Sequence, residues 1–510
     1  MNQPNAKEAL KHLHWRKAME EEFLALKKNN TWSLTQQKCD QKTVGCKWVF
    51  KIKRNSDGSI ARYKARLIAK GCHQTPNIDY NETFCLVVKP VTIRMLLTIA
   101  LMKGWIIKQL DVNNAFLHGV LEEDVYMEQP YDFETKASHP LVCHLRKAIY
   151  GLKQAPRAWY EKLCSSLHNL GFRTSKADSS LLIRSTSTSC CYILIYVDDL
   201  IIMGDSNKLL NDIIKALHSE FALKDLGALS YFLGVEVSYP TNGGMFLSQA
   251  KYITDLLQKT KMFDAKPIST PMISGQLVSA HHGENFHDIH LYRSTVGALQ
   301  YATLTHPEIS YSVINKACQF MHSPKLIHWQ LVKRILRYLK GSLSHGLWLQ
   351  CSTNLSSWKF TSSYCVYFGN NLVSWGSKKQ SIISRSSTEA EYSCLALLAT
   401  ELVWINSLLR DLGITLSQPL VLRCDNLNAV HLSANPILHS KAKYVELDIY
   451  FVRDLVRKKK ISIYHLPASQ QIADILTKPL SATSFHRLKN KLTIIDAAAI
   501  VLQGGVKAAH

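Results

Sequence analysis

Two adjacent carboxylates, in the run Tyr196-Val197-Asp198-Asp199, are the residues of this sequence best suited to chemistry. The flanking runs CYILIY and LIIM are too apolar for exposed strands, so acids between them need a counter-ion. Asp111, at the end of WIIKQL, could supply a third carboxylate. Such a trio could hold two Mg²⁺ ions about 3.5–4 Å apart and stabilise both oxygens of a phosphoryl transfer. Taken alone, an Asp-Asp pair is equally typical of an ordinary hairpin tip.

Apolar segments on either side of these acids predict the elements that position them. Short strands are expected at 190–196 and 200–203, with the two carboxylates between them. The earlier segments are a helix at 8–28, a hairpin at 43–68 that turns at Asn55-Ser56-Asp57-Gly58, a buried helix at 92–102 and a strand at 105–110. Helices mixed with antiparallel hairpins predict an α+β fold.

The second half of the chain has a different pattern. Residues 270–292 are polar, with Pro, Gly and clustered His, and indicate a connection. Residues 293–345 predict mainly helices, and short β runs alternate with helices beyond them. We expect a domain boundary in the polar stretch.

Charge and hydropathy narrow the class of protein. The net charge of +22 favours a polyanionic partner, although composition alone does not separate nucleic acid from an acidic membrane surface. The N-terminus lacks an apolar signal segment, and no run of about 18 uncharged apolar residues occurs. We therefore expect an intracellular, non-secreted protein that does not span a membrane.

Seven ordered motifs resemble the reverse transcriptase of copia-type LTR retrotransposons. They are RYKARLIAKG, QLDVNNAFLHG, EEDVYMEQP, AIYGLKQAPRAWY, YVDDLIIMG, FALKDLGALSYFLGVEV and LSQAKYITDLL, and they cover about Trp15 to Pro271. The resemblance implies a right-hand polymerase domain with palm and fingers. It makes Asp111, Asp198 and Asp199 the catalytic carboxylates that bind Mg²⁺, with Mn²⁺ as a possible substitute.

The same resemblance assigns nucleotide-binding residues. Phe116 falls where such polymerases keep a ring against the sugar C2′, although a plain core Phe is the alternative. Lys64 and Arg66 resemble residues that grip the triphosphate, but the sequence does not decide among Lys64, Arg66 and Lys70. The template-positioning motif is matched by Gly151, Lys153 and Gln154.

In the first half of the chain, two further positions match the reverse transcriptase family and one segment departs from it. Lys224 falls where the family has a possible general acid, and a plain surface Lys is as good an interpretation. Leu233-Gly234 match the primer-gripping hairpin. The family usually has Ser-Pro where this chain has Cys85-Leu86, so we expect local loosening without loss of activity.

From Tyr292 onward the chain resembles the ribonuclease H region of the same elements, which needs four carboxylates. Three have counterparts, at Glu391, Asp425 and Asp474. The first acid is missing, because no Asp or Glu occurs from Ile309 to Thr388. About fifteen family positions are absent there, so we expect the sheet to lack its first strand and the ribonuclease H activity to be lost. Glu389 is a poor substitute, since its helical spacing from Glu391 turns it away.

The expected domains are an N-terminal helix at 1–30, a reverse transcriptase at 31–270, a connection at 271–345, an incomplete RNase H-like α/β domain at 346–490 and a tail at 491–510. The implied function is an RNA-directed DNA polymerase whose partners are an RNA template, a DNA primer and dNTPs. A non-catalytic nucleic-acid-binding relic is the alternative.

No protease or integrase signature precedes Trp15, so we expect a fragment of a polyprotein. A cytoplasmic particle or the nucleus would be its place of work. The sequence leaves its oligomeric state open.

Overall fold

The structure is a computed structural model that describes residues 6–38, 42–54, 59–83, 88–135, 137–241, 243–275, 279, 283–351, 358–361, 364–377, 386–416, 418–434 and 446–504. The chain divides into two compact units. The N-terminal unit comprises Met1–Val88, Lys108–Ser175 and Ser179–Gly227, and the C-terminal unit comprises Lys89–Ile107, Lys176–Asp178 and Ala228–His510.

The first part of the N-terminal unit packs a helix on a long hairpin. Its elements are α1 (Ala6–Ala9), α2 (Leu13–Lys28), β1 (Trp32–Gln36), β2 (Cys46–Arg54), β3 (Ile60–Ala69), η1 (Gly71–His73), β5 (Val120–Met127) and β6 (Leu141–Lys147). Strands β2 and β3 pair with each other, and a second sheet has the order β1-β6-β5. Met19 and Leu26 of α2 share a buried core with Phe50 and Leu67 of the hairpin. The expected turn at 55–58 lies outside the described residues.

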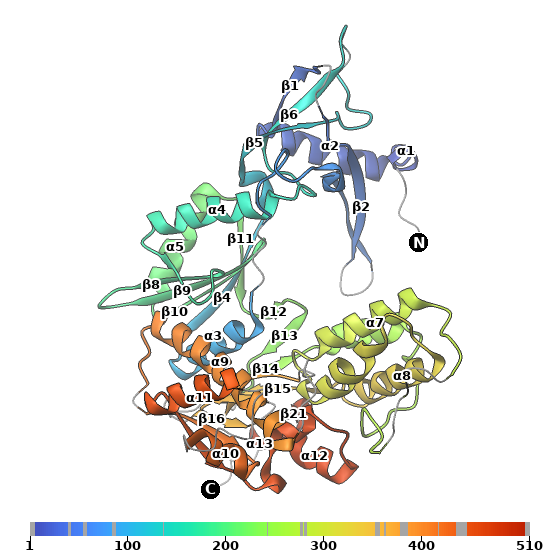
Figure 1. Ribbon diagram of the computed structural model, residues 1–510. Coiled ribbons are helices and arrows are strands. Elements are labelled where there is room, and N and C mark those ends of the chain that lie inside the picture. Colours follow the sequence, from blue (N-terminus) through green and yellow to red (C-terminus); the bar gives the residue numbers. More distant parts are fainter. Residues whose placement is uncertain are drawn as a thin grey trace. The chain divides into compact units, whose positions relative to one another are not determined.

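The second part of this unit is a six-stranded sheet of order β11-β4-β10-β9-β8-β7. Its elements are β4 (Ile106–Val112), η2 (Ala115–His118), α4 (Ala155–Asn169), β7 (Arg173–Thr174), β8 (Leu181–Ser185), β9 (Cys190–Tyr196), β10 (Asp199–Gly204), α5 (Asn207–Glu220) and β11 (Leu223–Ala228). Helices α4 and α5 cover one face of this sheet (Figure 1), and their residues Leu163 and Ile213 are buried in one core with Ile193 of β9. The antiparallel pair β9–β10 confirms the strands expected around the two acids.

The C-terminal unit contains a sheet of order β12-β13-β14-β15-β21 and a set of helices. The elements are α3 (Pro90–Met102), β12 (Tyr231–Phe232), β13 (Val235–Ser238), β14 (Met245–Ser248), α6 (Ala250–Lys259), α7 (Ile289–Ala302), η3 (Pro307–Ile309), η4 (Tyr311–Lys316), η5 (Ala317–Phe320), α8 (Leu326–Lys340), β15 (His345–Leu349), β21 (Ile494–Asp496) and α13 (Ala497–Gly504). Residues expected to form only a tail thus include an edge strand, β21, which pairs with β15.

A mixed sheet of order β18-β17-β16-β19-β20 forms the rest of this unit. Its elements are β16 (Trp358–Thr361), β17 (Cys365–Phe368), β18 (Asn371–Trp375), α9 (Ser387–Asp411), β19 (Leu420–Cys424), α10 (Leu427–Ala434), α11 (Glu446–Arg457), β20 (Ile461–His465), η7 (Ala468–Gln470), η8 (Ile472–Leu476) and α12 (Ala482–Lys491). We expected this sheet to lack its first strand, but β16 lies between β17 and β19 and pairs with both. Strand pairing uses backbone groups, so the loss of an acidic motif did not remove the strand.

Helix α9 is long and apolar enough to cross a membrane by length and composition. Half of its most apolar window is buried inside the protein, and the core helix of a soluble protein passes the same test. Among the described residues it is the one helix that meets these criteria.

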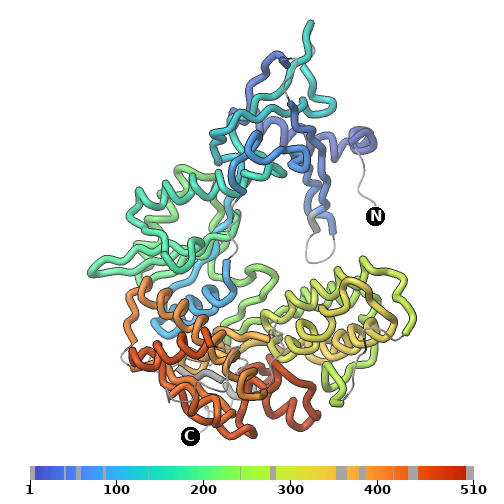
Figure 2. Tube along the Cα trace, in the orientation of Figure 1, coloured from blue at the N-terminus to red at the C-terminus, as the bar shows by residue number. Residues whose placement is uncertain are grey.

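Helix α3 belongs to the C-terminal unit, although its sequence neighbours on both sides lie in the other unit. Arg94 of α3 is buried, donates from Nε to the Val373 carbonyl at 2.7 Å, and lies 3.9 Å from the Trp375 ring centroid. Lys89 lies 4.1 Å from the ring centroid of Trp404 in α9. Figure 2 shows this blue segment among the orange elements of the C-terminal unit. The expected boundary at residue 270 therefore does not separate the two units.

Candidate active site

The turn between β9 and β10 presents Asp198 and Asp199. Asp199 pairs with Tyr196, which leaves Val197 and Asp198 at the tip. Val197 has a φ of 54°, an uncommon value for a β-branched residue. Two hydrogen bonds hold the turn: Trp159 Nε1 donates to the Val197 carbonyl at 2.6 Å, and the Val112 amide donates to the Asp198 carbonyl at 2.9 Å. The second bond joins the tip to the end of β4, next to Asp111.

The three carboxylates interact electrostatically. Burial, then the Asp198 charge, raises the pKa of Asp199 to about 6, although a hydrogen bond with Gln109 opposes the change. The pKa of Asp111 is raised by burial and by Asp198, and it is lowered in part by Lys224, Lys64 and Arg66. Negative charge is therefore concentrated at the junction of β4, β9 and β10. A bound cation would relieve this repulsion.

This donor set suits a hard divalent cation, because all three side chains offer carboxylate oxygens. The trio is not among the groups, within the described part of the chain, whose potential ligand atoms all lie within 4.8 Å of one another.

Strand β3 directs a row of cations to one face. Lys64, Arg66 and Lys70 are half-buried, whereas the alternating Ala65, Leu67 and Ala69 are buried. The predicted alternation along this strand is therefore confirmed. Lys64 and Arg66 both lower the pKa of Asp111, so both charges act on that carboxyl.

Glu22 of α2 supports this strand from the opposite side. It is 9% exposed, and burial raises the pKa of its carboxyl, whereas Arg66, a hydrogen bond from the Leu67 amide and Lys64 lower it. A buried acid beside two cations compensates part of their charge and ties α2 to β3.

Phe116 lies in η2, five residues beyond Asp111. Its ring packs edge-on against Tyr150, with ring centroids 4.8 Å apart and an interplanar angle of 66°. Phe116 is only partly buried and lies against both cores of the N-terminal unit. Part of the residue therefore remains accessible, and both the sugar-contact role and the packing role stay predictions.

The loop that contains Gly151, Lys153 and Gln154 is fixed against the end of β3. Gly151 has a φ of +94°, and a Cβ there would lie 2.1 Å from the Ala69 carbonyl oxygen, so only glycine fits. Lys153 is exposed. Gln154 is 2% exposed, accepts from Gln74 Nε2 at 3.0 Å and donates to the Asp79 carbonyl at 2.9 Å. Its amide is engaged within the protein, so it holds the loop and is not presented to a ligand.

Three remaining predictions fall in different places. Lys224 is exposed on β11, and its charge lowers the pKa of Asp111. Leu233 and Gly234 form the turn between β12 and β13 in the C-terminal unit, both with positive φ. The Cys85-Leu86 departure lies outside the described residues.

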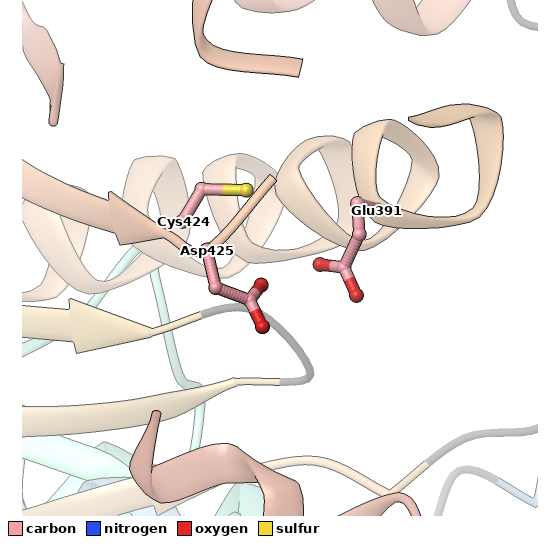
Figure 3. Close-up of side chains that lie close together, drawn as sticks. All are labelled: Glu391, Cys424 and Asp425. Carbon is pink, nitrogen blue, oxygen red and sulfur yellow. The ribbon is translucent and has the colours of Figure 1, made fainter. Parts of the chain in front are cut away.

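A second group of acids lies in the C-terminal unit. Glu391 of α9, with Cys424 and Asp425 at the end of β19, places one potential ligand atom from each residue within 4.8 Å of the others (Figure 3). Burial, then the neighbouring Asp425 charge, raises the pKa of Asp474 in η8, whereas its contact with Lys478 lowers it. Glu391 and Asp425 are therefore brought together, and Asp474 interacts electrostatically with Asp425. Glu389 is buried, unlike the half-buried Glu391.

Sequence reasoning missed four side chains around the first site: Glu22, Gln109, Tyr150 and Trp159. Gln109 could have been found, because it lies two residues before Asp111 on the same strand and so shares its face. Tyr150 and Trp159 lie inside the motif AIYGLKQAPRAWY, but the motif match gave neither residue a role of its own. Glu22 comes from a distant segment, and nothing in its local sequence indicates its contact with the site.

Comparisons with known proteins identify relatives of this chain. Residues 29–274 match the family described as reverse transcriptase (RNA-dependent DNA polymerase). The chain is 46% identical over 503 residues to the retrovirus-related Pol polyprotein from transposon RE1 of Arabidopsis thaliana, covering 96% of this chain and 34% of that protein. The corresponding polyprotein from transposon TNT 1-94 of Nicotiana tabacum is 35% identical and covers 93% of this chain and 37% of that protein.

The chain thus spans about a third of the length of these curated relatives. It also covers 93% of an uncharacterized mitochondrial protein of Arabidopsis thaliana, with 45% identity over 228 residues and 42% of this chain. Among solved structures, the foamy viral protease-reverse transcriptase in complex with an RNA/DNA hybrid is 14% identical, with a TM-score of 0.48, and the match covers 92% of this chain and 55% of that chain.

Proposed function

Since this chain belongs to the Pol polyprotein family of copia-type LTR retrotransposons, we propose that it is an RNA-directed DNA polymerase that extends a primer with dNTPs. The observation that carries the proposal is the electrostatic interaction of Asp111 with Asp198 on one side and with Lys64 and Arg66 of β3 on the other. Acids that can hold metal ions therefore interact with basic groups that can hold a triphosphate. On this proposal, the six-stranded sheet is the palm and the β2–β3 hairpin belongs to the fingers.

The three carboxylates would hold two Mg²⁺ ions, with Mn²⁺ as a substitute. When bound, these ions lower the energy of the attacking and leaving oxygens during phosphoryl transfer. Asp111 anchors the site from β4, and the hydrogen bond between Val112 and Asp198 keeps the two acidic segments aligned.

The other residues act on the nucleotide. Lys64 and Arg66 bind the triphosphate of the incoming dNTP, and the planar guanidinium of Arg66 suits phosphate oxygens. Phe116 offers an apolar wall to the sugar C2′ and disfavours a 2′-hydroxyl. Exposed Lys224 can give a proton to the departing pyrophosphate. In this step the primer 3′-hydroxyl loses its proton to solvent, its oxygen bonds to the α-phosphorus, and the bond from that phosphorus to the oxygen of the β-phosphate breaks. The net charge of +22 suits a template–primer duplex.

We infer that the mixed sheet with its helices is an RNase H-like domain without ribonuclease activity. Glu391, Asp425 and Asp474 supply three acids, but strand β16, Trp358–Thr361, carries no carboxylate. Two-metal hydrolysis needs carboxylates that bind both ions, and no Asp or Glu is available from Ile309 to Thr388.

A primer-extension assay on a homopolymer RNA template with Mg²⁺ tests the polymerase proposal. We expect incorporation by the parent and its loss in Asp111→Asn and Asp198→Asn, because each change removes a metal ligand. Template–primer affinity should stay within about twofold, since neither change removes a phosphate-binding cation.

Two results would contradict the proposal. Incorporation above about a tenth of the parent rate in either variant would rule out the assigned acids, because loss of a catalytic metal site costs several kcal/mol of barrier. A parent that binds template–primer without extending it would support the non-catalytic alternative.

A further inference from the structure

The Tyr150 side chain lies between two groups of the proposed nucleotide site. The guanidinium carbon of Arg66 is 4.1 Å from the centroid of its ring. The Phe116 ring centroid is 4.8 Å away, in an edge-on arrangement. Tyr150 therefore contacts both the residue assigned to the triphosphate and the residue assigned to the sugar.

The backbone around Tyr150 is fixed from several directions. The Ala69 amide donates to the Tyr150 carbonyl at 2.8 Å, which joins the residue to the end of β3. The chain turns at Gly151, whose positive φ and close approach to Ala69 exclude a side chain. The Lys153 amide donates to Gln74 Oε1 at 2.8 Å and holds the loop beyond the turn. A ring on such a rigid support can orient mobile side chains that contact it.

Arg66 needs such support. Its Nε is buried and has no hydrogen-bond partner among the residues that the structure describes. The Tyr150 ring face therefore orients the guanidinium plane, and a desolvated cation over an aromatic ring is held more strongly than an exposed one. Glu22 contributes an opposite charge from the α2 side, which attracts the guanidinium without fixing the direction of its plane.

We propose that Tyr150 is a positioning residue that holds Arg66 for the incoming triphosphate and Phe116 for the sugar. This inference rests on the proposed polymerase function. It predicts that nucleotide affinity and discrimination against ribonucleotides depend together on one aromatic ring.

Replacement of the ring tests the proposal. We expect Tyr150→Leu to weaken dNTP binding about fivefold to thirtyfold, equivalent to ~1–2 kcal/mol of lost cation–π stabilisation. The preference for dNTP over rNTP should fall as well, while template–primer affinity stays within about twofold. Tyr150→Phe keeps both ring contacts and should restore affinity and selectivity. Tyr126→Leu is a matched control, because Tyr126 stacks on His144 and contacts neither assigned residue.

A double-mutant comparison separates positioning from simple packing. Arg66→Lys keeps the charge but lacks the planar group that stacks on the ring. If Tyr150 acts through Arg66, adding Tyr150→Leu to Arg66→Lys should weaken dNTP binding by less than about twofold more. If the role of Tyr150 is purely structural, the losses of dNTP affinity from the two single substitutions should multiply in the double variant. The melting temperature should then fall in proportion to the loss of affinity.

Affinity should be measured without turnover, as binding of the next dNTP to the protein on a dideoxy-terminated template–primer with Ca²⁺ in place of Mg²⁺. Unchanged dNTP binding in Tyr150→Leu, or equal losses in Tyr150→Leu and Tyr150→Phe, would overturn the inference. A parent that binds dNTP in a Tyr150-dependent way but does not extend the primer would support the inference and refute the proposed catalysis. A parent that binds no dNTP would overturn both.

Discussion

Replacing Asp199 by Asn is expected to stabilise the metal-free protein while it impairs catalysis. Asp199 is partly buried beside Asp198 and Asp111, and its pKa is raised from an ordinary value of 3.8 to about 6. Its ionised form is therefore unfavourable in the folded state when no cation is bound. Asn has nearly the same shape and can still accept the hydrogen bond from Gln109, so the main change is loss of the charge.

The size and pH dependence of the effect follow from linkage. The folded state binds the Asp199 proton more tightly than the unfolded state, so the stabilising contribution of the protonated group is fully present below about pH 4 and is lost as the pH rises through about 6. With a pKa difference of about 2.2, the ionisable Asp199 lowers the free energy of unfolding, relative to an uncharged side chain of the same shape, by ~3 kcal/mol at pH 8 and by roughly half of that at pH 5. Because Asp199 is only partly buried and coupled to two other acids, we expect about 1.5–3 kcal/mol at pH 8.

Urea unfolding in EDTA at pH 5 and pH 8 measures this directly. The free energy of unfolding of Asp199→Asn should exceed that of the parent, and the excess should grow with pH. Added Mg²⁺ should stabilise the parent more than the variant. Asp212→Asn, at an exposed position on α5, is the matched control. Equal or lower stability of Asp199→Asn at pH 8 in EDTA would refute the electrostatic description of the site.

Three other predictions have defined outcomes. Phe116→Val should admit ribonucleotides at least about tenfold more readily, and unchanged dNTP/rNTP selectivity in single-nucleotide incorporation would return Phe116 to a packing role. The parent should not cleave the RNA strand of an RNA·DNA hybrid with Mg²⁺ or Mn²⁺, and cleavage that disappears in Asp425→Asn would show that the domain is active. Trp375→Ala should lower the free energy of unfolding by about 2 kcal/mol or more, because it uncovers the desolvated Arg94 guanidinium. Thermal unfolding of the full chain measures this change, and an unchanged melting temperature would show that the contact does not contribute to stability.

Local sequence was sufficient to predict a strand wherever an apolar run of strand length is bounded by charged or turn residues. The strands on either side of Asp198 and Asp199 were predictable for this reason, as was the alternation of Lys64 and Arg66 on β3. The presence of helix α3 was predictable as well, since its apolar residues continue without a break until Lys103-Gly104.

Contacts between residues far apart in the sequence could not be predicted from local sequence patterns. The amide of Gln154 is occupied by Gln74 and Asp79, more than 70 residues earlier in the chain, which no local pattern reveals. Strand β16 was unexpected because its pairing depends on backbone groups of β17 and β19 and not on its own side-chain pattern. The assignment of α3 to the C-terminal unit depends on partners such as Val373, 279 residues after Arg94.

That last contact has a consequence for synthesis of the protein on the ribosome. Helix α3 ends at Met102, and its partner strand β18 begins at Asn371, so about 270 residues must be added between them. At roughly 5–20 residues per second, the apolar helix waits about 14–54 s for the strand against which it packs. During that interval the nascent chain needs either a chaperone or a temporary intramolecular cover for α3, and a ribosome that stops before β18 would release a chain with this helix exposed.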